Sequence, residues 1–589
     1  MIFLSIRSTA AAQVHRFPTP FLATRLHVGD CGFPQANRAP TCAIVSPPRA
    51  MARFMLGGRA ILDDRSIVNF RTQSGERPAV GRVALLRMPP FPGARPLARP
   101  RLRERGRTTL PAPHSDDIGA VAIKIAEARV GGSFWQSACI GDQRSHGATP
   151  TRLDPWPQIE AGAPILAHTD DEIALLAAAA GRAVLRPDDR QPYARETLLD
   201  ALHLRLASFD YFDPWTAQPI TLLKWIEILG EWRRIIDRNR EIAFVCGVTA
   251  WKREVLGKFL WAGRVPKFAR RPSKVSPSAE QAIAIWPSRV KWAVRQQVRA
   301  SGGRLIQIED GFIRSAGLGA RLTLPFSIVV DRTGIYYDPR TTSDLEHLLA
   351  NDELGPEICA RAAKLIEFIG MHGITKYAAG SSTGPDLPSS VRKVLVAGQV
   401  ADDRSVSLGC AAVTGPLDLL RRVREVEPDA FIIFKPHPDV VAGLRLGHVP
   451  SFEALRYVDQ ILPHAPIDAL LAQVDAVHVL SSQTGFEALL RGREVFTHGH
   501  PFYAGWGLTR DLASPIERRR RKLTLEQLVA ATLILYPRYL DPVTRLPCPP
   551  EILAQRLSTG CMPRPGILQK LRMLQGHLRL ARQALVNAC

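Results

Sequence analysis

The sequence has no long apolar run. Of its 589 residues 46% are hydrophobic, yet no uninterrupted apolar stretch approaches the roughly 18 to 20 residues that a membrane-spanning helix needs. The first residues, MIFLSIR, hold only a very short apolar run before Arg7, with no basic residue ahead of it. We therefore expect neither a membrane span nor a signal peptide. The length suffices for two or more domains and a large core.

Paired cysteines are also missing. The nine cysteines are scattered, and no C-x-x-C pair occurs among them. Nothing in their spacing resembles a zinc set or a disulfide framework. A reducing, cytoplasmic compartment is therefore the expected location.

The net charge of +22 is unevenly distributed. Residues 1–150 hold 21 Lys and Arg against 9 Asp and Glu, and 20 of those 21 cations are Arg interleaved with Pro. This composition predicts a poorly ordered or divergent basic extension over 1–150. The remaining chain is only mildly basic, and it has no zinc finger, no RNP-like strand and no stripe of interleaved aromatics. We therefore expect no nucleic-acid partner.

A short segment occurs twice. YFDPWTAQP at 211–219 recurs as YLDPVTRLP at 539–547, and each copy follows a helical stretch that begins with Thr-Leu. The repeat predicts that residues 151–240 are a degenerate remnant of a first module and that a whole second module follows. Since the first copy has no counterpart of the KPHPD sequence of the second, we expect it to be inactive. Chance similarity over so few residues is the alternative.

Strand-like and helical segments alternate through the second module. IAFVCGV, AIAIWP, RLIQIEDG and FSIVVD precede a polar Gly/Ser/Pro-rich linker at 376–391, and VLVAGQV, FIIFKPHP, DAVHVLSS and EVFTHG follow it. This alternation is typical of parallel βαβ units. It predicts an α/β fold of two Rossmann-like subdomains, 241–380 and 390–560, with a cleft between them.

The KPHP sequence follows one of these strands. Phe431 to Phe434 form a β-prone apolar run, and Lys435 begins the loop. The two prolines restrict the backbone on both sides of His437. A cation and an imidazole are thus held at the carboxyl end of a strand, where α/β sheets place ligands. An ordinary solvated loop is the alternative.

Polar residues follow other strands in the same way. The groups are Glu309, Asp310 and Arg314; Gln399, Asp402, Asp403 and Ser405; and Ser481, Ser482, Gln483, Thr484 and Glu487. The last group begins a helix, whose free N–H groups and hydroxyls suit a phosphate. Each loop alone could be a cap or a turn, but together they indicate a binding site.

These motifs carry a family resemblance. EDGFIRSAGLG, PFSIVVDRTGIYYD, GQVADDRSVSLG, KPHPDVVAGLRLG, SSQTGFEALLRGREV and HPFYAGWGLT resemble, in order, the β-Kdo transferases of bacterial capsule polysaccharide biosynthesis. Those enzymes build a short Kdo linker on a phospholipid anchor. The resemblance covers about 242–557. Members often carry two modules in tandem; the complete module here is more similar to the second, and the first is a remnant.

The resemblance implies a GT-B-type arrangement and a retaining transfer of Kdo from CMP-Kdo to a lipid-linked Kdo acceptor. Double displacement needs a carboxylate nucleophile and a second carboxyl group as acid/base. The motifs place Asp403 as the nucleophile and Glu309 as the acid/base, with Asp310 as its orienting neighbour. The alternatives are an Asx turn for Asp403 and a structural ion pair with Arg314 for Glu309.

The resemblance also implies a substrate-binding set. Lys435 and His437 would meet the phosphate and carboxylate of the donor, and Glu487 would accept from the ribose hydroxyls. The other members of the set are Arg314, Gln399, Ser481, Ser482 and Thr484. No Asp-x-Asp sequence of the metal-dependent kind occurs, so neither a metal nor a cofactor is expected.

Two other functions remain open from the sequence: transfer from another nucleotide-sugar, such as a UDP-sugar, and a noncatalytic role in capsule assembly or export. Docking on the anionic inner membrane is expected through Arg518–Arg521, which could instead be a solvated loop. The amphipathic segment 561–589 is expected to pack on the module as a helix rather than lie in lipid. The aromatics of HPFYAGWGLT are either core residues or a wall of the sugar site.

Overall fold

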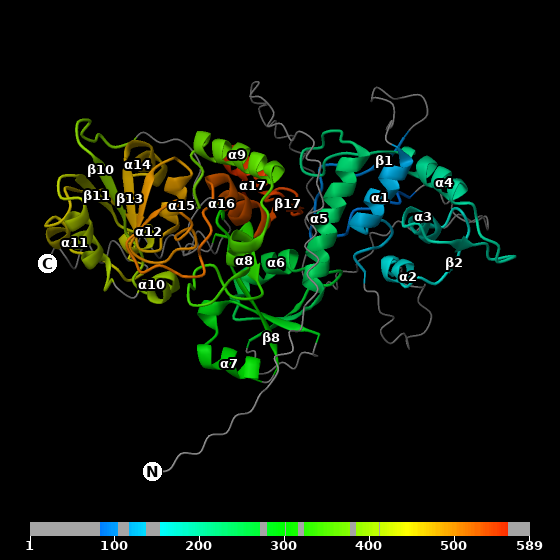
Figure 1. Cartoon of the computed structure of the whole chain (residues 1–589), viewed down its shortest axis with the longest axis horizontal. Coiled ribbons are helices and arrows are strands. Elements are labelled where there is room, and N and C mark those ends of the chain that lie inside the picture. Colours follow the sequence, from blue (N-terminus) through cyan, green and yellow to red (C-terminus); the bar gives the residue numbers. More distant parts are fainter. Residues whose placement is uncertain are drawn as a thin grey trace, which may run out of the picture.

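The computed structural model describes residues 83–103, 117–136, 153–270, 280–300, 302–315, 323–376, 384–410, 413–443 and 445–563. A mostly helical segment and two α/β halves follow one another along the long axis of the molecule (Figure 1). The long helix α5 (Leu222–Arg240) runs along the boundary between the helical segment and the first α/β half.

The helical segment has its own apolar core. Its helices are α1 (Ile118–Ala128), α2 (Trp156–Glu160), α3 (Glu172–Ala179), α4 (Arg195–Ala207) and α5, and its short strands are β1 (Arg101–Leu102), β2 (Ile165–Leu166), β3 (Val184–Leu185) and β4 (Phe209–Asp210). Helix α1 packs on α3, α4 and α5. Trp225 and Trp232, on one face of α5, are fully buried in this core.

Part of the predicted basic extension belongs to this core. Leu85, Leu86 and Phe91 are buried, and so is one face of α1. Residues 83–103 and 117–136 are therefore packed rather than poorly ordered, because a few apolar side chains among the Arg and Pro residues find partners on α5; that the extension is divergent stays a prediction. The Trp225 Nε1 donates to the carbonyl of Leu86 at 2.9 Å. The rest of 1–150 lies outside the described residues.

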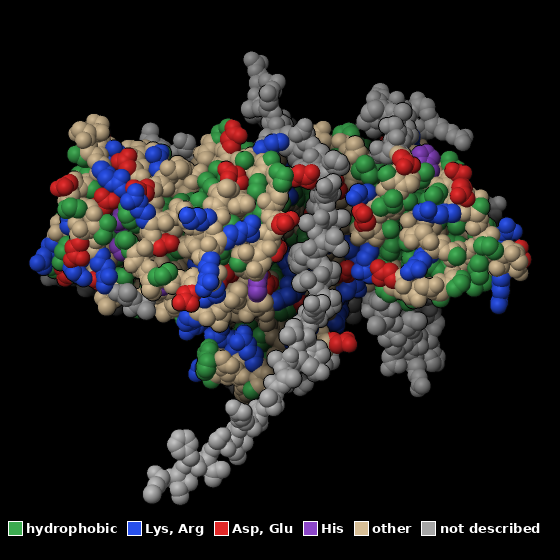
Figure 2. All heavy atoms as spheres, in the orientation of Figure 1, with side chains coloured by type: hydrophobic (Ala, Val, Ile, Leu, Met, Phe, Trp, Pro, Cys, Tyr) green, Lys and Arg blue, Asp and Glu red, His purple; other side chains and the backbone are tan. Residues whose placement is uncertain are grey.

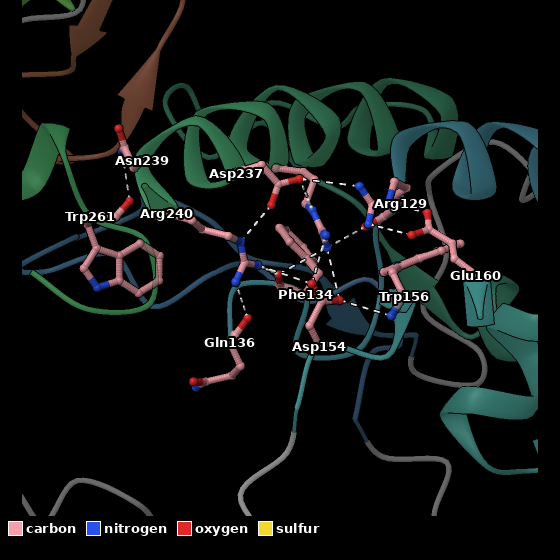
Figure 3. A network of polar contacts seen from close by, with 11 residues as sticks. Arg129, Phe134, Gln136, Asp154, Trp156, Glu160, Asp237, Asn239, Arg240 and Trp261 are labelled. Atoms are coloured by element: carbon pink, nitrogen blue, oxygen red, sulfur yellow. Dashed lines mark hydrogen bonds and ion pairs between the residues drawn. The ribbon is translucent and has the colours of Figure 1, made fainter. Parts of the chain in front are cut away.

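Buried arginines attach this segment to α5. Arg233 and Arg240 of α5 both pair with Asp154, at 2.9 and 3.3 Å, and both donate to the carbonyl of Phe134. Figure 3 shows this network, in which Arg240 also donates to the carbonyl of Gln136 at 2.6 Å. The segment after α1 and the residue just before α2 are thus held against the helix that leads into the first sheet.

The first α/β half contains a seven-stranded sheet of order β17-β16-β9-β8-β7-β5-β6. Its strands are β5 (Ile242–Cys246), β6 (Lys267–Ala269), β7 (Ala282–Ile285), β8 (Arg304–Asp310), β9 (Ser327–Asp331), β16 (Pro537–Leu540) and β17 (Pro547–Cys548). Strands β5 to β8 are parallel, and β9, β16 and β17 are antiparallel to their neighbours. Its helices are α6 (Ala250–Phe259), α7 (Trp292–Ala300), α8 (Asp344–Asn351) and α9 (Pro356–Met371), with the 3-10 turn η3 (Pro287–Arg289).

The second half contains a six-stranded, wholly parallel sheet of order β12-β11-β10-β13-β14-β15. Its strands are β10 (Lys393–Ala397), β11 (Phe431–Lys435), β12 (Gln460–Ile461), β13 (Ala476–Val479), β14 (Glu494–Thr497) and β15 (Arg510–Asp511). Its helices are α10 (Arg404–Gly409), α11 (Pro416–Val426), α12 (Pro438–Val441), α13 (Ser451–Ala454), α14 (Ile467–Gln473) and α15 (Gln483–Leu489). The α/β class with parallel strands is confirmed, and the GT-B-type arrangement stays a prediction.

The chain returns to the first half at its end. After α16 (Leu525–Val529) and the π-helix η5 (Ala530–Leu535), strand β16 pairs with β9, and α17 (Pro550–Ser558) follows β17. The predicted subdomain 390–560 therefore does not correspond to one sheet, because residues 537–548 complete the sheet that begins at 242. No apolar periodicity reveals to which of two sheets a strand returns.

The two copies of the repeat form the same turn. Asp213 and Asp541 each accept hydrogen bonds from the backbone N–H groups two and three residues later. Four residues after each aspartate, Ala217 and Arg545 have positive φ angles of 61° and 62°. The turn thus has one geometry in both copies, although the helical segment has only two-stranded sheets among the residues that the structure describes.

No helix among the described residues is long and apolar enough to cross a membrane. Within the predicted helix 561–589, residues 564–589 lie outside the described part of the chain.

Candidate active site

The KPHP loop lies against the end of the neighbouring strand. Lys435 is the last residue of β11, and the backbone N–H of Gly398, just after β10, donates to its carbonyl at 2.8 Å. A Cβ at position 398 would lie 3.0 Å from the Cα of Pro436 and 3.1 Å from the backbone nitrogen of His437. Glycine is needed there because two strand-end loops approach so closely.

The two charged residues of this loop are largely buried. Lys435 is 9% exposed, its Nζ lies 3.3 Å from the carbonyl of Pro463, and burial lowers its pKa. His437 caps α12, with its Nδ1 accepting from the N–H of Asp439 at 3.1 Å. Burial lowers the pKa of His437, against the charges of Asp439 and Asp403. A neutral imidazole held through Nδ1 presents its Nε2 as the donor.

Asp403 stands at the start of α10. Its Oδ1 accepts from the backbone N–H of Ser405 at 2.9 Å and from its hydroxyl at 3.1 Å. The Asx-type cap expected as the bland alternative is therefore present. This cap also orients the carboxylate, because the Oδ1 atom accepts both of the hydrogen bonds that the Asp403 side chain makes within the described chain. The charge of Asp403 acts on His437, so the KPHP loop and the DDRSV loop share one space.

Glu309 and Asp310 lie at the end of β8 and have opposite pKa shifts. Burial, together with the charge of Asp310, raises the pKa of Glu309 to about 7. Burial would also raise the pKa of Asp310, but Arg314 and Lys252 hold it well below its usual range. The Oδ1 of Asp310 lies 3.1 Å from Lys252, and its Oδ2 lies 2.8 Å from Arg314. Two adjacent carboxyl groups thus differ in protonation near neutral pH.

Arg314 is fully buried and bonded within the protein. Its Nε donates to Asp310, its Nη1 to the Ser315 hydroxyl and its Nη2 to the carbonyl of Thr323. The predicted alternative, an ion pair between Arg314 and Glu309, is replaced by a pair with Asp310. In this structure Arg314 fixes the orientation of Asp310, and its assignment to the substrate-binding set stays a prediction.

A tyrosine pair connects the carboxylates of the two halves. Tyr336 and Tyr337 follow β9; burial raises the pKa of both, and the charges of Glu309 and Asp403 raise it further. Glu309 from the first half and Asp403 from the second thus both lie within electrostatic range of these two phenols. Neither tyrosine was among the predicted site residues, although both belong to the motif PFSIVVDRTGIYYD. Two adjacent tyrosines just after a predicted strand were the available sign.

Lys252 was also missed. It comes from α6, and its Nζ lies 3.7 Å from the ring centroid of Trp286 as well as beside Asp310. A lysine in the first turn of a helix gives no local sign of a partner on another strand.

Gln399 joins two loops of the second half. Its Oε1 accepts from the N–H of Ser481 at 2.8 Å, and its Nε2 lies 3.2 Å from the Ser481 hydroxyl. That hydroxyl donates in turn to Ser405 at 3.1 Å. Gln399 and Ser481 thus position the loop that carries Asp403.

The helix that begins with SSQT is capped by its own hydroxyls. The Ser482 hydroxyl accepts from the N–H of Thr484 at 3.2 Å, and the two hydroxyls lie 3.1 Å apart. Tyr503 donates to the carbonyl of Ser482, and a Cβ at Gly485 would collide with the Tyr503 hydroxyl. The predicted phosphate contacts of Ser482 and Thr484 stay predictions.

Residues of α15 also hold the two halves together. Gln483 donates to the carbonyl of Phe312 at 2.7 Å, and the buried Glu487 accepts from the N–H of Lys376 at 2.7 Å. Phe312 packs on Phe502 of the HPFYAGWG sequence, with ring centroids 4.7 Å apart. The aromatics of that sequence belong to the core, since Tyr503 and Trp506 are fully buried.

The arginine tetrad is mainly structural. Arg518 and Arg519 pair with Glu346 of α8, and Arg521 donates to the carbonyl of Asp352 at 2.7 Å. Arg519 is 7% exposed and cannot contact a membrane. Of the four arginines predicted to dock on lipid, Arg519 is therefore not available, whereas Arg518 and Arg520 are exposed, and docking on the membrane stays a prediction.

Comparisons with known proteins find relatives of the part of the chain that contains these residues. A family model described as capsule polysaccharide biosynthesis protein matches residues 281–383 and 369–539, which include every predicted site residue. The chain is 42% identical over 356 residues to the capsule polysaccharide modification protein LipA of Neisseria meningitidis, from serogroup A and from serogroup B. That match covers 59% of this chain and 50% of LipA, so the chain spans about half the length of those relatives.

A further relative is matched over most of its length. The lipopolysaccharide-processing protein LpsZ of Rhizobium meliloti is 38% identical over 326 residues, 53% of this chain and 72% of LpsZ. The chain belongs to the capsule polysaccharide biosynthesis family. The resemblance inferred from the motifs is thereby confirmed.

Two solved structures are similar to a little over half of this chain. They are the β-Kdo 2,7 and β-Kdo 2,4 transferases of Thermosulfurimonas dismutans KpsC, at 30% and 33% identity. They cover 55% and 54% of this chain, and 100% and 98% of their own, each with a TM-score of 0.46. Among the described residues, no group of three or more His, Cys, Asp or Glu side chains is placed to hold a metal ion.

Proposed function

We propose that this protein is a retaining β-Kdo glycosyltransferase that transfers Kdo from CMP-Kdo to a lipid-linked Kdo acceptor in capsule polysaccharide biosynthesis. The motifs that define the family resemblance support the donor and acceptor. The observation that carries the proposal is the arrangement of Glu309 and Asp403, which come from different sheets and act on one tyrosine pair.

In the first half-reaction, the Asp403 carboxylate attacks the anomeric carbon of the donor. A carbon–oxygen bond to Asp403 forms while the bond to the phosphate oxygen breaks, and CMP leaves with the electron pair. In this proposal His437 and Lys435 stabilise that phosphate. Both Asp403 Oδ1 hydrogen bonds come from Ser405, so the carboxylate is oriented before the substrate arrives.

In the second half-reaction, the hydroxyl of the acceptor attacks the same carbon and displaces Asp403. Glu309 takes the proton of that hydroxyl. A carboxyl group with a pKa of about 7 suits this task, because it exchanges protons near the operating pH. Two displacements at one carbon restore the original configuration.

A lipid-linked acceptor would bring the protein to the anionic inner leaflet of the membrane as a peripheral protein. The Arg518–Arg521 tetrad contributes little to such docking, because its side chains serve α8 and neighbouring loops. The acceptor itself is therefore the main link to the membrane in this proposal.

The test is incubation of the purified full chain with CMP-Kdo and a synthetic lipid-linked Kdo acceptor. We expect an acceptor product heavier by one Kdo residue and with β configuration. Parallel reactions contain UDP-sugars, and product from those alone would mean a different donor class. Absence of product with every donor would favour a noncatalytic role in capsule assembly or export.

A further inference from the structure

Two arginines, one from each α/β half, have buried Nε atoms without a partner among the described residues. Arg295 lies on α7 of the first half, and Arg404 is the first residue of α10 in the second half. Among the described residues, nothing accepts a hydrogen bond from either Nε, although both atoms are buried. The hydroxyl of Tyr337 is likewise buried and unbonded. Leaving such groups unpaired is costly, so each such group in a folded protein needs an explanation.

These three side chains occupy one region of the molecule. Arg404 and Tyr337 both act on the guanidinium of Arg295, and both arginines act on the phenol of Tyr337. Glu309 and Asp403 act on the same phenol. The unpaired groups and the two carboxylates to which the proposed reaction is assigned therefore lie within electrostatic range of the same phenol.

The neighbouring carboxylate does not pair with these arginines. Asp338 lies within electrostatic reach of both, but it is bound through both oxygens to Arg340, at 2.8 Å each. Two guanidinium groups thus lie within electrostatic range of each other, and neither Nε is bonded to an anion in the described chain. An anion brought by a ligand would relieve their repulsion and accept the free N–H groups.

The surface beside Arg295 also suits a sugar. Trp292 lies one turn earlier on α7, on the same side of the helix, and is 62% exposed. Figure 2 shows Lys and Arg side chains over the projecting region where Figure 1 labels α7. An exposed indole can pack on a sugar ring while the planar fork of an arginine binds a carboxylate through two hydrogen bonds.

We propose that Arg295, Arg404 and Tyr337 bind the carboxylate of a sugar-acid substrate, with Trp292 against the sugar ring. This inference rests on the proposed function, in which donor and acceptor both carry a Kdo carboxylate. The donor phosphate is already assigned to Lys435 and His437. Because Lys435 and His437 are also assigned to the donor carboxylate, the carboxylate of the acceptor is the one left for these groups.

The test compares Arg295→Gln and Arg404→Gln with Arg299→Gln, an exposed arginine on the same helix as Arg295. Acceptor and donor concentrations are varied separately. Loss of a charge-assisted pair should raise KM for the bound sugar acid by about 10- to 150-fold in the first two variants. Arg299→Gln should match the wild type. A rise in the acceptor KM assigns the subsite to the acceptor, and a rise in the donor KM assigns it to the donor.

A second arm replaces the acceptor carboxylate by a carboxamide. If the acceptor occupies the subsite, the carboxamide should raise the acceptor KM of the wild type as much as Arg404→Gln raises it for the natural acceptor. The carboxamide should not raise the acceptor KM of Arg404→Gln any further. Unchanged KM values for both substrates in Arg295→Gln and Arg404→Gln would overturn the proposal. If either variant does not fold, Arg404→Lys keeps the charge without the fork and should show an intermediate KM.

A binding measurement separates this inference from the proposed function. Calorimetric titration with a Kdo glycoside does not require transfer. Binding by the wild type and its loss in Arg404→Gln would support the subsite even if CMP-Kdo gave no product. If the wild type transfers Kdo but the wild type and Arg404→Gln bind the Kdo glycoside equally well, the proposed function stands and the proposed subsite is wrong.

Discussion

The carboxylate of Glu487 accepts a 2.7 Å hydrogen bond from the backbone N–H of Lys376, which joins α15 of the second half to the end of the first. Glu487 is 6% exposed, and burial raises its pKa. We expect Glu487→Ala to reduce the free energy of unfolding by about 1 to 3 kcal/mol, because a buried N–H loses its acceptor. Glu487→Gln keeps an acceptor and should lose much less. Thermal unfolding checks both, and equal melting temperatures for Ala and Gln would contradict this role.

Asp403→Asn should abolish transfer while CMP still binds. Asparagine can keep the cap of α10, so the fold should be preserved, but the amide is not a nucleophile. Product formation and CMP binding are measured together. The matched control is Asp402→Asn, since Asp402 is an exposed neighbour that pairs with Arg445 at 3.1 Å. Turnover by Asp403→Asn at the wild-type rate would exclude it as the nucleophile.

Lys435→Ala and His437→Ala should impair use of the donor far more than use of the acceptor. Loss of one charge-assisted hydrogen bond to a phosphate costs about 1.5 to 3 kcal/mol, or about 10- to 150-fold in kcat/KM. Steady-state kinetics with CMP-Kdo varied gives the value. His448→Ala is the control, because His448 is an exposed histidine of the same region. A donor kcat/KM that stays at the wild-type value in both variants would rule out the phosphate role.

The rate of transfer should fall below about pH 7. Glu309 must be deprotonated to act as a base, and burial with the charge of Asp310 raises its pKa to about 7. Asp310→Asn removes that neighbouring charge, so the acid limb should move to lower pH. Glu309→Gln should leave a low rate with no such limb. Rate profiles from pH 5 to 9 test this, and an unmoved limb in Asp310→Asn would contradict the coupling.

The same shift predicts a pH-dependent stability. The pKa of Glu309 in the folded protein lies above its ordinary value of 4.5. The stabilisation of the folded state that comes from this shift is therefore fully present below about pH 4.5 and is lost as the pH rises through about 7. Glu309→Gln should therefore gain in melting temperature relative to the wild type between pH 5 and pH 8. A difference that stays constant over that range would argue against the raised pKa.

Asp154→Ala should loosen the helical segment. Arg233, which is 3% exposed, would lose its buried partner Asp154 and keep only the partly exposed Asp237 of α5 as an ion-pair partner. Breaking such a buried pair costs on the order of 3 kcal/mol. Hydrogen exchange should rise in 117–136 and 153–240 and stay unchanged in the second sheet. Uniform exchange across the chain would show that the network of Figure 3 is not local.

Local features of the sequence determined the parallel α/β halves and the strand-end position of the KPHP loop. A run such as Phe431–Phe434 followed by Lys435 and two prolines constrains its own backbone, so its conformation can be inferred without knowing the partners. The cap at Asp403 and the repeated turn at Asp213 and Asp541 are equally local. Each depends on side chains and N–H groups no more than a few residues apart.

Only the tertiary structure decided which distant residues meet. It paired Arg314 with Asp310 rather than with Glu309, and placed Lys252 beside the same carboxylate. It joined strands 537–548 to the sheet that begins at 242, and buried Arg519 against Glu346. It brought Tyr337, Arg295 and Arg404 together from three separate elements. Such contacts depend on how two sheets and their loops pack, and the periodicity of one segment contains no information about the residues that another segment brings to it.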